Sequence, residues 1–390
     1  MPNYSGKWKL PTVMQAEGAG TWPKPPVGVP SEVWTWGSGN YGALAQGSGT
    51  TSYSSPVQVG ALTDWAKIAS PSGGGATIKN DGTLWTWGWN QYGQLGIGDT
   101  TNRSSPVQVG ALTSWLYIGS GIYQGYAITS GGTLWAWGSG NSGGLGQGNT
   151  TNYSSPVQVG ALTTWAKVSG GQFLAGAIKT DGTLWMWGRN NQGALGDGTT
   201  VDKSSPVQVG ALTTWSEVYP RAYFTMALKT DGTVWCWGSN NSGQLGQSDT
   251  TNTSSPVQVG VFTTWATIGP GSETDLANSE WAMAVKTDGT LWTWGDGSKG
   301  QLGDSAKTDR SSPVQVGALT TWDSVSGSRK TSYARKTDGT IWAWADAGDG
   351  QLGTGSAVSV SSPVQVGALT TWGALGKPAW GIHQNALTPV

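Results

Sequence analysis

The chain has 390 residues, of which 21 are Lys or Arg and 22 are Asp or Glu, and its formal net charge at pH 7 is −1. This balance excludes the strongly basic surface that attracts nucleic acids or anionic membranes, so neither is expected as a partner. A single cysteine, Cys236, excludes an intrachain disulfide, and a single histidine, His383, excludes a Cys/His zinc cluster, so we expect no metal and no cofactor.

The first segment, residues 1–30, precedes the repeats and is predicted to be an extended N-terminal arm, because its prolines favour extended backbone. It has no charged start followed by an apolar core, as a secretory signal would, and the chain has no apolar run of 18 residues for a membrane span. The predicted anchors of the arm are Trp8, Leu10 and Trp22. They pack either against the rest of the chain or against a neighbouring subunit.

Seven Trp-x-Trp pairs organise the second predicted region, residues 31–390. They lie at Trp34/Trp36, Trp85/Trp87, Trp135/Trp137, Trp185/Trp187, Trp235/Trp237, Trp292/Trp294 and Trp342/Trp344. Alternate side chains of a strand share one face, so each pair forms one broad apolar surface. Seven such surfaces predict seven equivalent sheets that bury them against one another in a ring.

A second marker, SSPVQVG, starts at Ser54 and recurs at intervals of 50 residues, apart from one interval of 57. Within one unit we predict four strands: PVQV from Pro156, WAKVSG from Trp165, FLAGAIK from Phe173 and TLWMWG from Thr183. The fold class is therefore all-β, a seven-bladed β-propeller of four-stranded antiparallel blades in a single domain. The strand SEVWTWG, from Ser31, is predicted to join the three C-terminal strands in one blade and so close the ring.

The runs WTWGWNQYGQLG from Trp85 and WCWGSNNSGQLG from Trp235, each followed by Pro-Val-x-Val, resemble the regulator-of-chromosome-condensation repeat. The resemblance covers about residues 31–390 and implies a seven-bladed propeller. The run from Gly381 to Leu387 also matches the family pattern G-x-H-x-x-A-L at His383. Other blades depart from it at the histidine and have Tyr123, Phe173 and Tyr223 instead.

The resemblance alone does not assign a function. The best-known member of the family exchanges nucleotide on a Ran-type GTPase and binds chromatin. This chain lacks a long insertion similar to the exchange wedge, a basic tail and a charge excess, so nucleotide exchange is not expected. The segment SGKWKLPTVMQAEGAGTWP is similar in style to the starts of structural proteins of tailed bacteriophages.

The leading hypothesis from these features is a non-enzymatic virion protein of a bacteriophage, either a capsid decoration or a tail or tail-fibre component. It is made in the host cytoplasm, attached by the arm to other virion proteins, and presents a face to a host-surface protein or glycan. The alternative is a cytoplasmic propeller that binds a protein partner and regulates or inhibits it.

The units differ from one another mainly in the links that are predicted to share one face of the ring, and loops on a rigid scaffold commonly carry binding. The candidate binding residues in these links are Trp89, Tyr123, Phe173, Arg189, Arg221, Tyr223, Trp281, Arg329 and His383. The alternative is that strand starts such as Phe173, Tyr223 and Trp281 pack inside. No catalytic residue is predicted, because a triad would have to use His383 at a structural position.

Two further features keep more than one interpretation. The seven-residue excess adds Glu273 and Asp275 in an acidic loop that contacts a partner, binds a cation, or is only a tolerated insertion. The seven tryptophans that begin the second strand of each unit, such as Trp165, form either a sugar-binding aromatic ring or part of the core; core packing is favoured.

Overall fold

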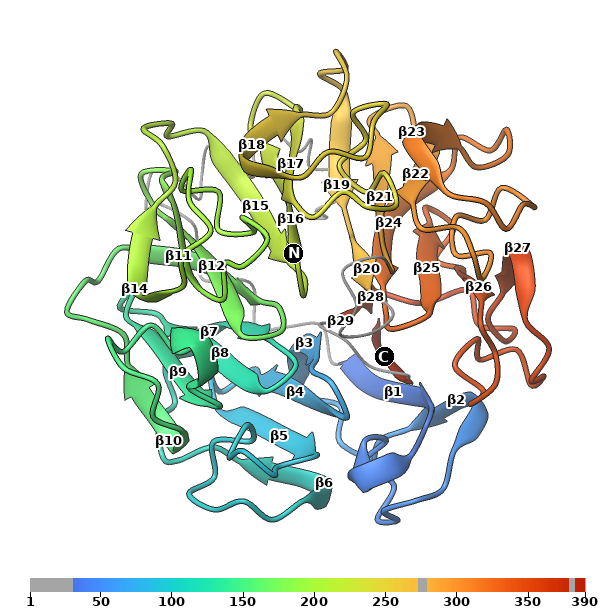
Figure 1. Ribbon diagram of the computed structural model, residues 1–390. Coiled ribbons are helices and arrows are strands. Elements are labelled where there is room, and N and C mark those ends of the chain that lie inside the picture. Colours follow the sequence, from blue (N-terminus) through green and yellow to red (C-terminus); the bar gives the residue numbers. More distant parts are fainter. Residues whose placement is uncertain (1–30, 273–278, 379–382, 390) are drawn as a thin grey trace, which may run out of the picture.

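The computed structural model describes residues 31–272, 279–378 and 383–389. Within them, seven sheets stand in a ring, with their strands ordered from the centre outward (Figure 1). The strands of each sheet are antiparallel, apart from one short parallel pair at the centre. The predicted all-β, seven-bladed propeller is thereby confirmed.

Each blade has four principal strands. The innermost strands are β3 (Trp65–Ser70), β7 (Trp115–Ser120), β11 (Trp165–Gly170), β15 (Trp215–Pro220), β19 (Trp265–Ile268), β24 (Trp322–Gly327) and β28 (Ala374–Leu375). The second strands are β4 (Gly74–Lys79), β8 (Gln124–Thr129), β12 (Leu174–Lys179), β16 (Phe224–Lys229), β21 (Glu280–Lys286), β25 (Thr331–Lys336) and β30 (His383–Pro389). The third strands carry Trp-x-Trp: β5 (Leu84–Gly88), β9 (Leu134–Gly138), β13 (Leu184–Gly188), β17 (Val234–Gly238), β22 (Leu291–Gly295), β26 (Ile341–Ala345) and β1 (Ser31–Gly37). The outermost strands are β6 (Arg103–Gln108), β10 (Tyr153–Gln158), β14 (Lys203–Gln208), β18 (Thr253–Gln258), β23 (Arg310–Gln315), β27 (Val360–Gln365) and β2 (Tyr53–Gln58).

In this article the sheets are numbered blade 1 (β3 to β6) to blade 6 (β24 to β27) in chain order, and the sheet that contains both chain ends is the closing blade. Four short elements complete the description: β20 (Gly271–Ser272) pairs with β21, β29 (Lys377–Pro378) pairs in parallel with β3, and the 3-10 turns η1 (Asn40–Gly42) and η2 (Asn141–Gly143) lie in loops.

The SSPVQ strand ends a blade, whereas we predicted that it begins one. In blade 3, Gln208 of β14 pairs with Trp185 of β13, so the order is β11-β12-β13-β14. The prediction was therefore wrong by one strand. The cause is the glycine-rich segment after each Trp-x-Trp-Gly, which we interpreted as a crossing to the next blade. It folds back along the same sheet instead.

The two chain ends share one blade, as predicted, but each end contributes two strands. β1 pairs with β30 at seven positions, from Ser31 with Pro389 to Gly37 with His383. β2 lies outside β1, and β28 lies inside β30. The expected arrangement of one N-terminal strand with three C-terminal strands is wrong, because the last SSPVQ strand, β27, completes blade 6. Seven paired positions between the ends close the ring without a free sheet edge at this point.

The second tryptophan of each pair joins neighbouring blades. Trp187 is fully buried, and its indole Nε1 donates a hydrogen bond to the backbone carbonyl of Gly144 in the preceding blade, at 2.9 Å. All seven equivalents make the same inter-blade bond, from Trp36, Trp87, Trp137, Trp187, Trp237, Trp294 and Trp344. A buried indole combines a large apolar area with a satisfied N–H group, so this bond stabilises every blade contact in the same way.

The first tryptophan of each pair belongs to a second repeated cluster. Trp185 is half-buried; it donates to the Thr183 hydroxyl, which donates to Asp181. Lys179 lies over the Trp185 ring at 3.7 Å, and Trp165 meets that ring edge-on at 6.2 Å. Trp165 and its six equivalents are between 1% and 4% exposed, which confirms core packing and means that these seven indoles do not form the surface ring expected for sugar binding.

Candidate binding face

Each blade sends two of its links to one face of the ring and two to the other, because its strands are antiparallel. The links between first and second strands and between third and fourth strands form what we call the variable face. The remaining links, with the recurring sequences TDGT and GALTT, form the repetitive face. Our prediction placed the blade boundary one strand away from its observed position, but this error does not change which links lie on which face. The links that we predicted to vary therefore do share one face.

The backbone identifies two equivalent positions on the variable face of each blade. In blade 3 the amide of Arg189 donates to the carbonyl of Phe173, at 2.9 Å. The same bond joins Trp89 to Gly73, Ser139 to Tyr123, Ser239 to Tyr223, Asp296 to Glu280 and Asp346 to Lys330 in blades 1, 2, 4, 5 and 6. One position is therefore occupied by aromatic residues in blades 2 to 4 and by charged residues in blades 5 and 6.

Aromatic side chains from successive blades contact one another and form a continuous surface that we call the aromatic arc. It consists of Tyr41, Trp89, Tyr92, Tyr123, Phe173 and Tyr223, together with Arg189. Tyr41 stacks on Trp89 with ring centroids 5.5 Å apart, and Tyr123 stacks on Phe173 at 4.8 Å. Trp89 meets Tyr123 edge-on at 5.6 Å. The arc thus crosses from the closing blade to blade 4.

Arg189 joins the last two rings of the arc. Its guanidinium carbon lies 4.6 Å from the centre of the Phe173 ring and 5.5 Å from that of Tyr223. Its Nη1 donates to Gln172 Oε1 at 2.8 Å and to the Tyr223 hydroxyl at 3.4 Å. Stacking on aromatic faces orients the planar guanidinium while its other N–H groups stay available for a partner.

Two residues of the arc have backbone conformations that L-residues disfavour. Tyr41 has φ of 61° and is 53% exposed, and Phe173 has φ of 89°. The position equivalent to Phe173 in blade 1 is Gly73, with φ of 69°. Strain of this kind costs on the order of 1–3 kcal/mol and accumulates at functional sites. Large aromatic side chains at positions suited to glycine therefore indicate selection for the surface that they form.

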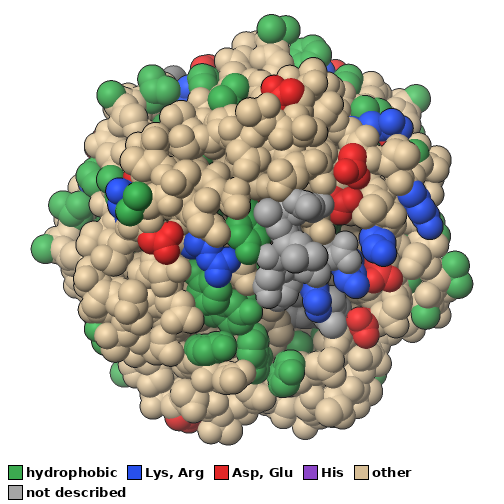
Figure 2. All heavy atoms as spheres, in the orientation of Figure 1, with side chains coloured by type: hydrophobic (Ala, Val, Ile, Leu, Met, Phe, Trp, Pro, Cys, Tyr) green, Lys and Arg blue, Asp and Glu red, His purple; other side chains and the backbone are tan. Residues whose placement is uncertain are grey.

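In the other half of the variable face, ionisable residues occupy the two equivalent positions. Lys330 and Asp346, at the two equivalent positions of blade 6, form an ion pair at 3.8 Å. In blade 5 the pair is Glu280 and Asp296, both buried. Figure 2 shows hydrophobic side chains gathered near the middle of the ring over β4, β5 and β8, and basic and acidic side chains over β21, β22, β25 and β26. One half of the face is therefore aromatic and the other half polar.

The structure brings together Trp89, Tyr123, Phe173, Arg189 and Tyr223 among the predicted binding residues. Two others lie inside: Trp281 is fully buried and bonds to Ser332, and Arg221 is 3% exposed and points toward the centre of the ring. Arg329 is half-buried in blade 6, and His383 begins β30. Glu273, Asp275 and the arm residues Trp8, Leu10 and Trp22 lie outside the described residues.

Tyr41 and Tyr92 were missed by the sequence analysis, although a signal exists. Both precede the glycine of the turn that follows Trp-x-Trp-Gly, in Asn40-Tyr41-Gly42 and Gln91-Tyr92-Gly93. The same column contains Ser142, Gln192, Ser242, Lys299 and Asp349 in the later blades. From blade to blade, the residue at this repeat position changes from aromatic to polar to charged, as the residues of the variable face do. A comparison of this one position among the repeats would have identified Tyr41 and Tyr92.

Glu280 and Arg221 form a buried charged cluster at the boundary of blades 4 and 5. Glu280 Oε1 accepts a hydrogen bond from the Tyr223 amide at 3.0 Å. Burial raises the pKa of Glu280 to about 8, against the smaller opposing effects of its hydrogen bonds and of Arg221. Burial also lowers the pKa of Arg221 to about 10. Burial therefore favours the neutral form of the carboxyl, whereas the guanidinium stays charged at neutral pH.

Among the described residues, no group of three or more His, Cys, Asp or Glu side chains is placed to hold a metal ion. In the same part of the chain no helix has the length and the hydropathy needed to cross a lipid bilayer.

Comparison with known proteins assigns the repeat. The family model of the regulator of chromosome condensation (RCC1) repeat matches residues 31–75, 81–128, 131–178, 181–228 and 288–334, and a second model of this repeat matches residues 222–244. These stretches cover more than half of the chain. The chain belongs to the RCC1 repeat family. The family resemblance expected from the tryptophan and GQLG motifs is thereby confirmed.

Solved RCC1 propellers share the fold. The chain is similar to yeast RCC1 (Prp20), solved bound to Kap60, with 17% identity and a TM-score of 0.81 over 92% of this chain and 89% of that chain. It is also similar to human WBSCR16, with 18% identity and a TM-score of 0.79 over 92% of this chain and 98% of that chain. At these identities the similarity establishes the fold alone, so the function of this RCC1-repeat propeller must be argued from its own surface.

Proposed function

We propose that the chain is a non-enzymatic protein-interaction propeller that docks a protein partner on the aromatic arc of its variable face. The observation that carries the proposal is the continuous contact from Tyr41 to Arg189 across the closing blade and blades 1 to 3. Tyr, Trp and Arg are the residues enriched at the centres of protein interfaces, where a few of them supply most of the binding energy.

The contacts within the arc favour a protein partner over a glycan. Sugars stack on open ring faces. Here Tyr41 covers a face of Trp89, and Phe173 lies between Tyr123 and Arg189. Ring edges and guanidinium N–H groups therefore make up much of what the arc offers a partner, with Tyr41 exposed at its end. Such a surface suits apolar side chains and backbone carbonyls of a protein better than the flat face of a sugar.

The relatives support an interaction role without naming the partner. Yeast RCC1 (Prp20) was solved with Kap60, and Prp20p from Saccharomyces cerevisiae was examined for its binding to Gsp1p and to histones. For this chain we propose a regulatory or inhibitory contact with a protein in the cytoplasm, without nucleotide exchange. The comparisons favour this interpretation over a bacteriophage virion role, whose motivation lies in residues 1–30, outside the described part.

Site-specific photo-crosslinking tests the proposal. A photoreactive residue replaces Tyr92 on the arc in one version of the full chain and the exposed Leu212 on the repetitive face in another. We expect one protein to crosslink in cells through position 92 and not through position 212. With that partner purified, Trp89→Ala should weaken binding at least tenfold, and Leu212→Ala should leave it unchanged.

Equal crosslinking from both positions, or unchanged affinity of the Trp89→Ala protein with its fold intact, would contradict the proposal. Fractionation of the same cells distinguishes a cytoplasmic role from a virion role. Recovery of the crosslinked complex in the soluble fraction supports a cytoplasmic interaction module, whereas stoichiometric recovery of the chain in purified phage particles supports the virion role.

A further inference from the structure

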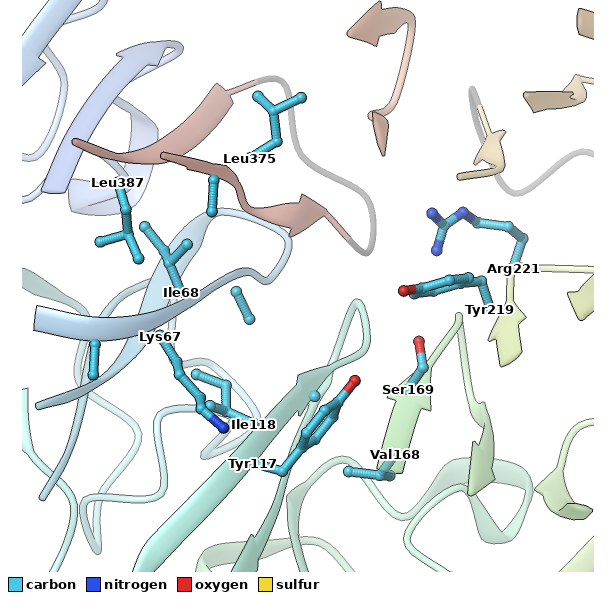
Figure 3. Close-up of a pocket in the computed structure, with 14 residues that line it drawn as sticks. Lys67, Ile68, Tyr117, Ile118, Val168, Ser169, Tyr219, Arg221, Leu375 and Leu387 are labelled. Carbon is cyan, nitrogen blue, oxygen red and sulfur yellow. The ribbon is translucent and has the colours of Figure 1, made fainter. Parts of the chain in front are cut away.

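A cavity of about 270 Å³ lies at the centre of the ring, between the innermost strands of the closing blade and blades 1 to 4. Its wall is apolar on one side, where Ile68, Ile118, Val168, Leu375 and Leu387 line it (Figure 3). Its volume is slightly below the range of pockets for drug-sized ligands, so an occupant must be small. It is distinct from the aromatic arc, none of whose residues line it.

Arg221 supplies a charge at one end of this cavity. The side chain is 3% exposed, and its bonds are to backbone carbonyls: Nε and Nη2 donate to Pro270, and Nη1 donates to Pro220. A guanidinium has five N–H donors, so these three bonds leave one N–H on each terminal nitrogen without a protein acceptor. Two parallel N–H groups match the two oxygens of a carboxylate.

Three hydroxyl groups line the cavity together with Arg221. Figure 3 shows the oxygens of Tyr117, Ser169 and Tyr219 directed into the same space, from β7, β11 and β15. Burial, and after it the charge of Glu217, raise the pKa of Tyr219 well above its ordinary value, and this neutral phenol is already hydrogen-bonded to the Glu217 side chain. The Ser169 hydroxyl is the group that can add a hydrogen bond to an anionic oxygen pair beside the buried guanidinium.

Among the described residues, the charged side chains that line the cavity itself are Arg221 and Lys67. Lys67 donates to the Leu116 carbonyl, with its ammonium 5.9 Å from the Tyr117 ring centre. Glu217, two residues before Tyr219 on β15, does not line the cavity but is hydrogen-bonded to the Tyr219 hydroxyl. Glu280 faces Arg221 from β21, and burial, which raises the pKa of its carboxyl to about 8, favours its neutral form.

We infer that the central cavity binds a small carboxylic acid with an apolar body, whose carboxylate is held by Arg221 and the Ser169 hydroxyl and whose apolar part lies against Ile118 and Val168. The charge and the N–H fork select the carboxylate, and the apolar wall selects against free inorganic anions. This site shares no residue with the aromatic arc. The inference can therefore be tested independently of the proposed function.

Titration calorimetry with hexanoate and its neutral analogue 1-hexanol tests the inference on the full chain. We expect hexanoate to bind with one site per chain and 1-hexanol to bind at least tenfold more weakly, because only the acid can form charge-assisted hydrogen bonds. Arg221→Gln should abolish hexanoate binding, and Ser169→Ala should weaken it several-fold. Arg103→Gln removes a cation on the outer strand β6 and should change nothing.

Because Arg221 is buried, the Arg221→Gln protein could fail to fold, and Ser169→Leu provides a second test that keeps the guanidinium. The leucine fills the cavity and should block hexanoate while the melting temperature stays near that of the unaltered protein. The inference is overturned if hexanoate does not bind, if 1-hexanol binds equally well, or if Ser169→Leu binds hexanoate as before. Binding of inorganic phosphate in place of hexanoate would also overturn it.

Discussion

The two faces of the ring use the same backbone for different purposes. On the repetitive face one set of contacts recurs from blade to blade: in blade 3, Trp185 donates to Thr183, Thr183 donates to Asp181, and Lys179 covers Trp185. On the variable face the equivalent positions differ, from aromatic in blades 1 to 4 to charged in blades 5 and 6. The contacts on the repetitive face stabilise every blade and recur in each of them. The variable positions are not needed for the stability of each blade, so their residues can differ and form a binding surface.

The two faces can diverge although the same strands connect them (Figure 1). The inter-blade bonds of the second tryptophans hold the links by backbone carbonyls, such as that of Gly144, and so do not fix the identity of side chains such as Trp89 and Tyr123. Substitutions in the two regions should therefore differ in kind. Tryptophans inside the ring should affect stability, whereas tryptophans on the variable face should affect binding.

The largest expected effect comes from Trp187→Ala, with Trp89→Ala as the matched control. Trp187 is fully buried and bonds to Gly144, whereas Trp89 is half-buried among side chains of the arc. Loss of the inner indole should lower the free energy of unfolding by about 3–5 kcal/mol, through the cavity and the unpaired carbonyl. Loss of the outer one should cost about 1 kcal/mol or less.

Urea denaturation of both variants measures the difference. If Trp89→Ala destabilised the protein as much as Trp187→Ala, the arc would be part of the core and the distinction between the two faces would collapse.

Glu280→Gln sharpens the comparison within the variable face, because Glu280 occupies the position of Tyr123 and Phe173 in its blade. The folded-state pKa of Glu280 is raised from 4.5 to about 8, so the folded protein favours the protonated form. Between about pH 4.5 and 8 the unfolded state loses this proton while the folded state keeps it, so the free energy of unfolding falls, by about 5 kcal/mol for a shift of this size. Glutamine keeps an oxygen acceptor for the Tyr223 amide and cannot ionise.

The free energy of unfolding, measured by urea at pH 5 and at pH 8.5, should consequently fall between the two pH values more in the unaltered protein than in the Glu280→Gln protein. The control is Trp89→Ala, which removes no ionisable group from the variable face and should leave the pH dependence as it was. Identical pH profiles for the unaltered and the Glu280→Gln proteins would show that this carboxyl is not buried as described.

Much of the fold was predictable because its signal is repeated seven times. Trp-x-Trp identified the third strand of every blade, and the missing strand at the chain end indicated closure by the termini. The blade boundary was not predictable in the same way. The connection after Trp187 and the connection after Val207 both lead into a strand, so the sequence does not show which of them crosses to the next blade. The pairing of Gln208 with Trp185 shows that the first connection joins two strands of the same sheet.

The site was only partly predictable from the sequence. Variable links identified Trp89, Tyr123 and Phe173, since difference between repeats is visible without a structure. The burial of Arg221 was not visible, because the carbonyl of Pro270 that accepts its hydrogen bonds comes from the next blade, 49 residues away. A charged residue in a loop is usually exposed, and only the packing of two blades reverses that expectation here.

The smallest expected effect, and the one that separates surface from scaffold most directly, is that of Tyr41→Gly. Tyr41 has φ of 61° and is 53% exposed, so its side chain contributes little packing while its backbone is strained. Glycine adopts positive φ without a steric penalty, and the free energy of unfolding should change by less than about 1 kcal/mol, in either direction. The stacking on Trp89 is lost, so affinity for the partner identified by crosslinking should fall several-fold. A stabilised protein that still bound this partner fully would leave the strain at Tyr41 without a functional reason, and the arc would then begin at Trp89.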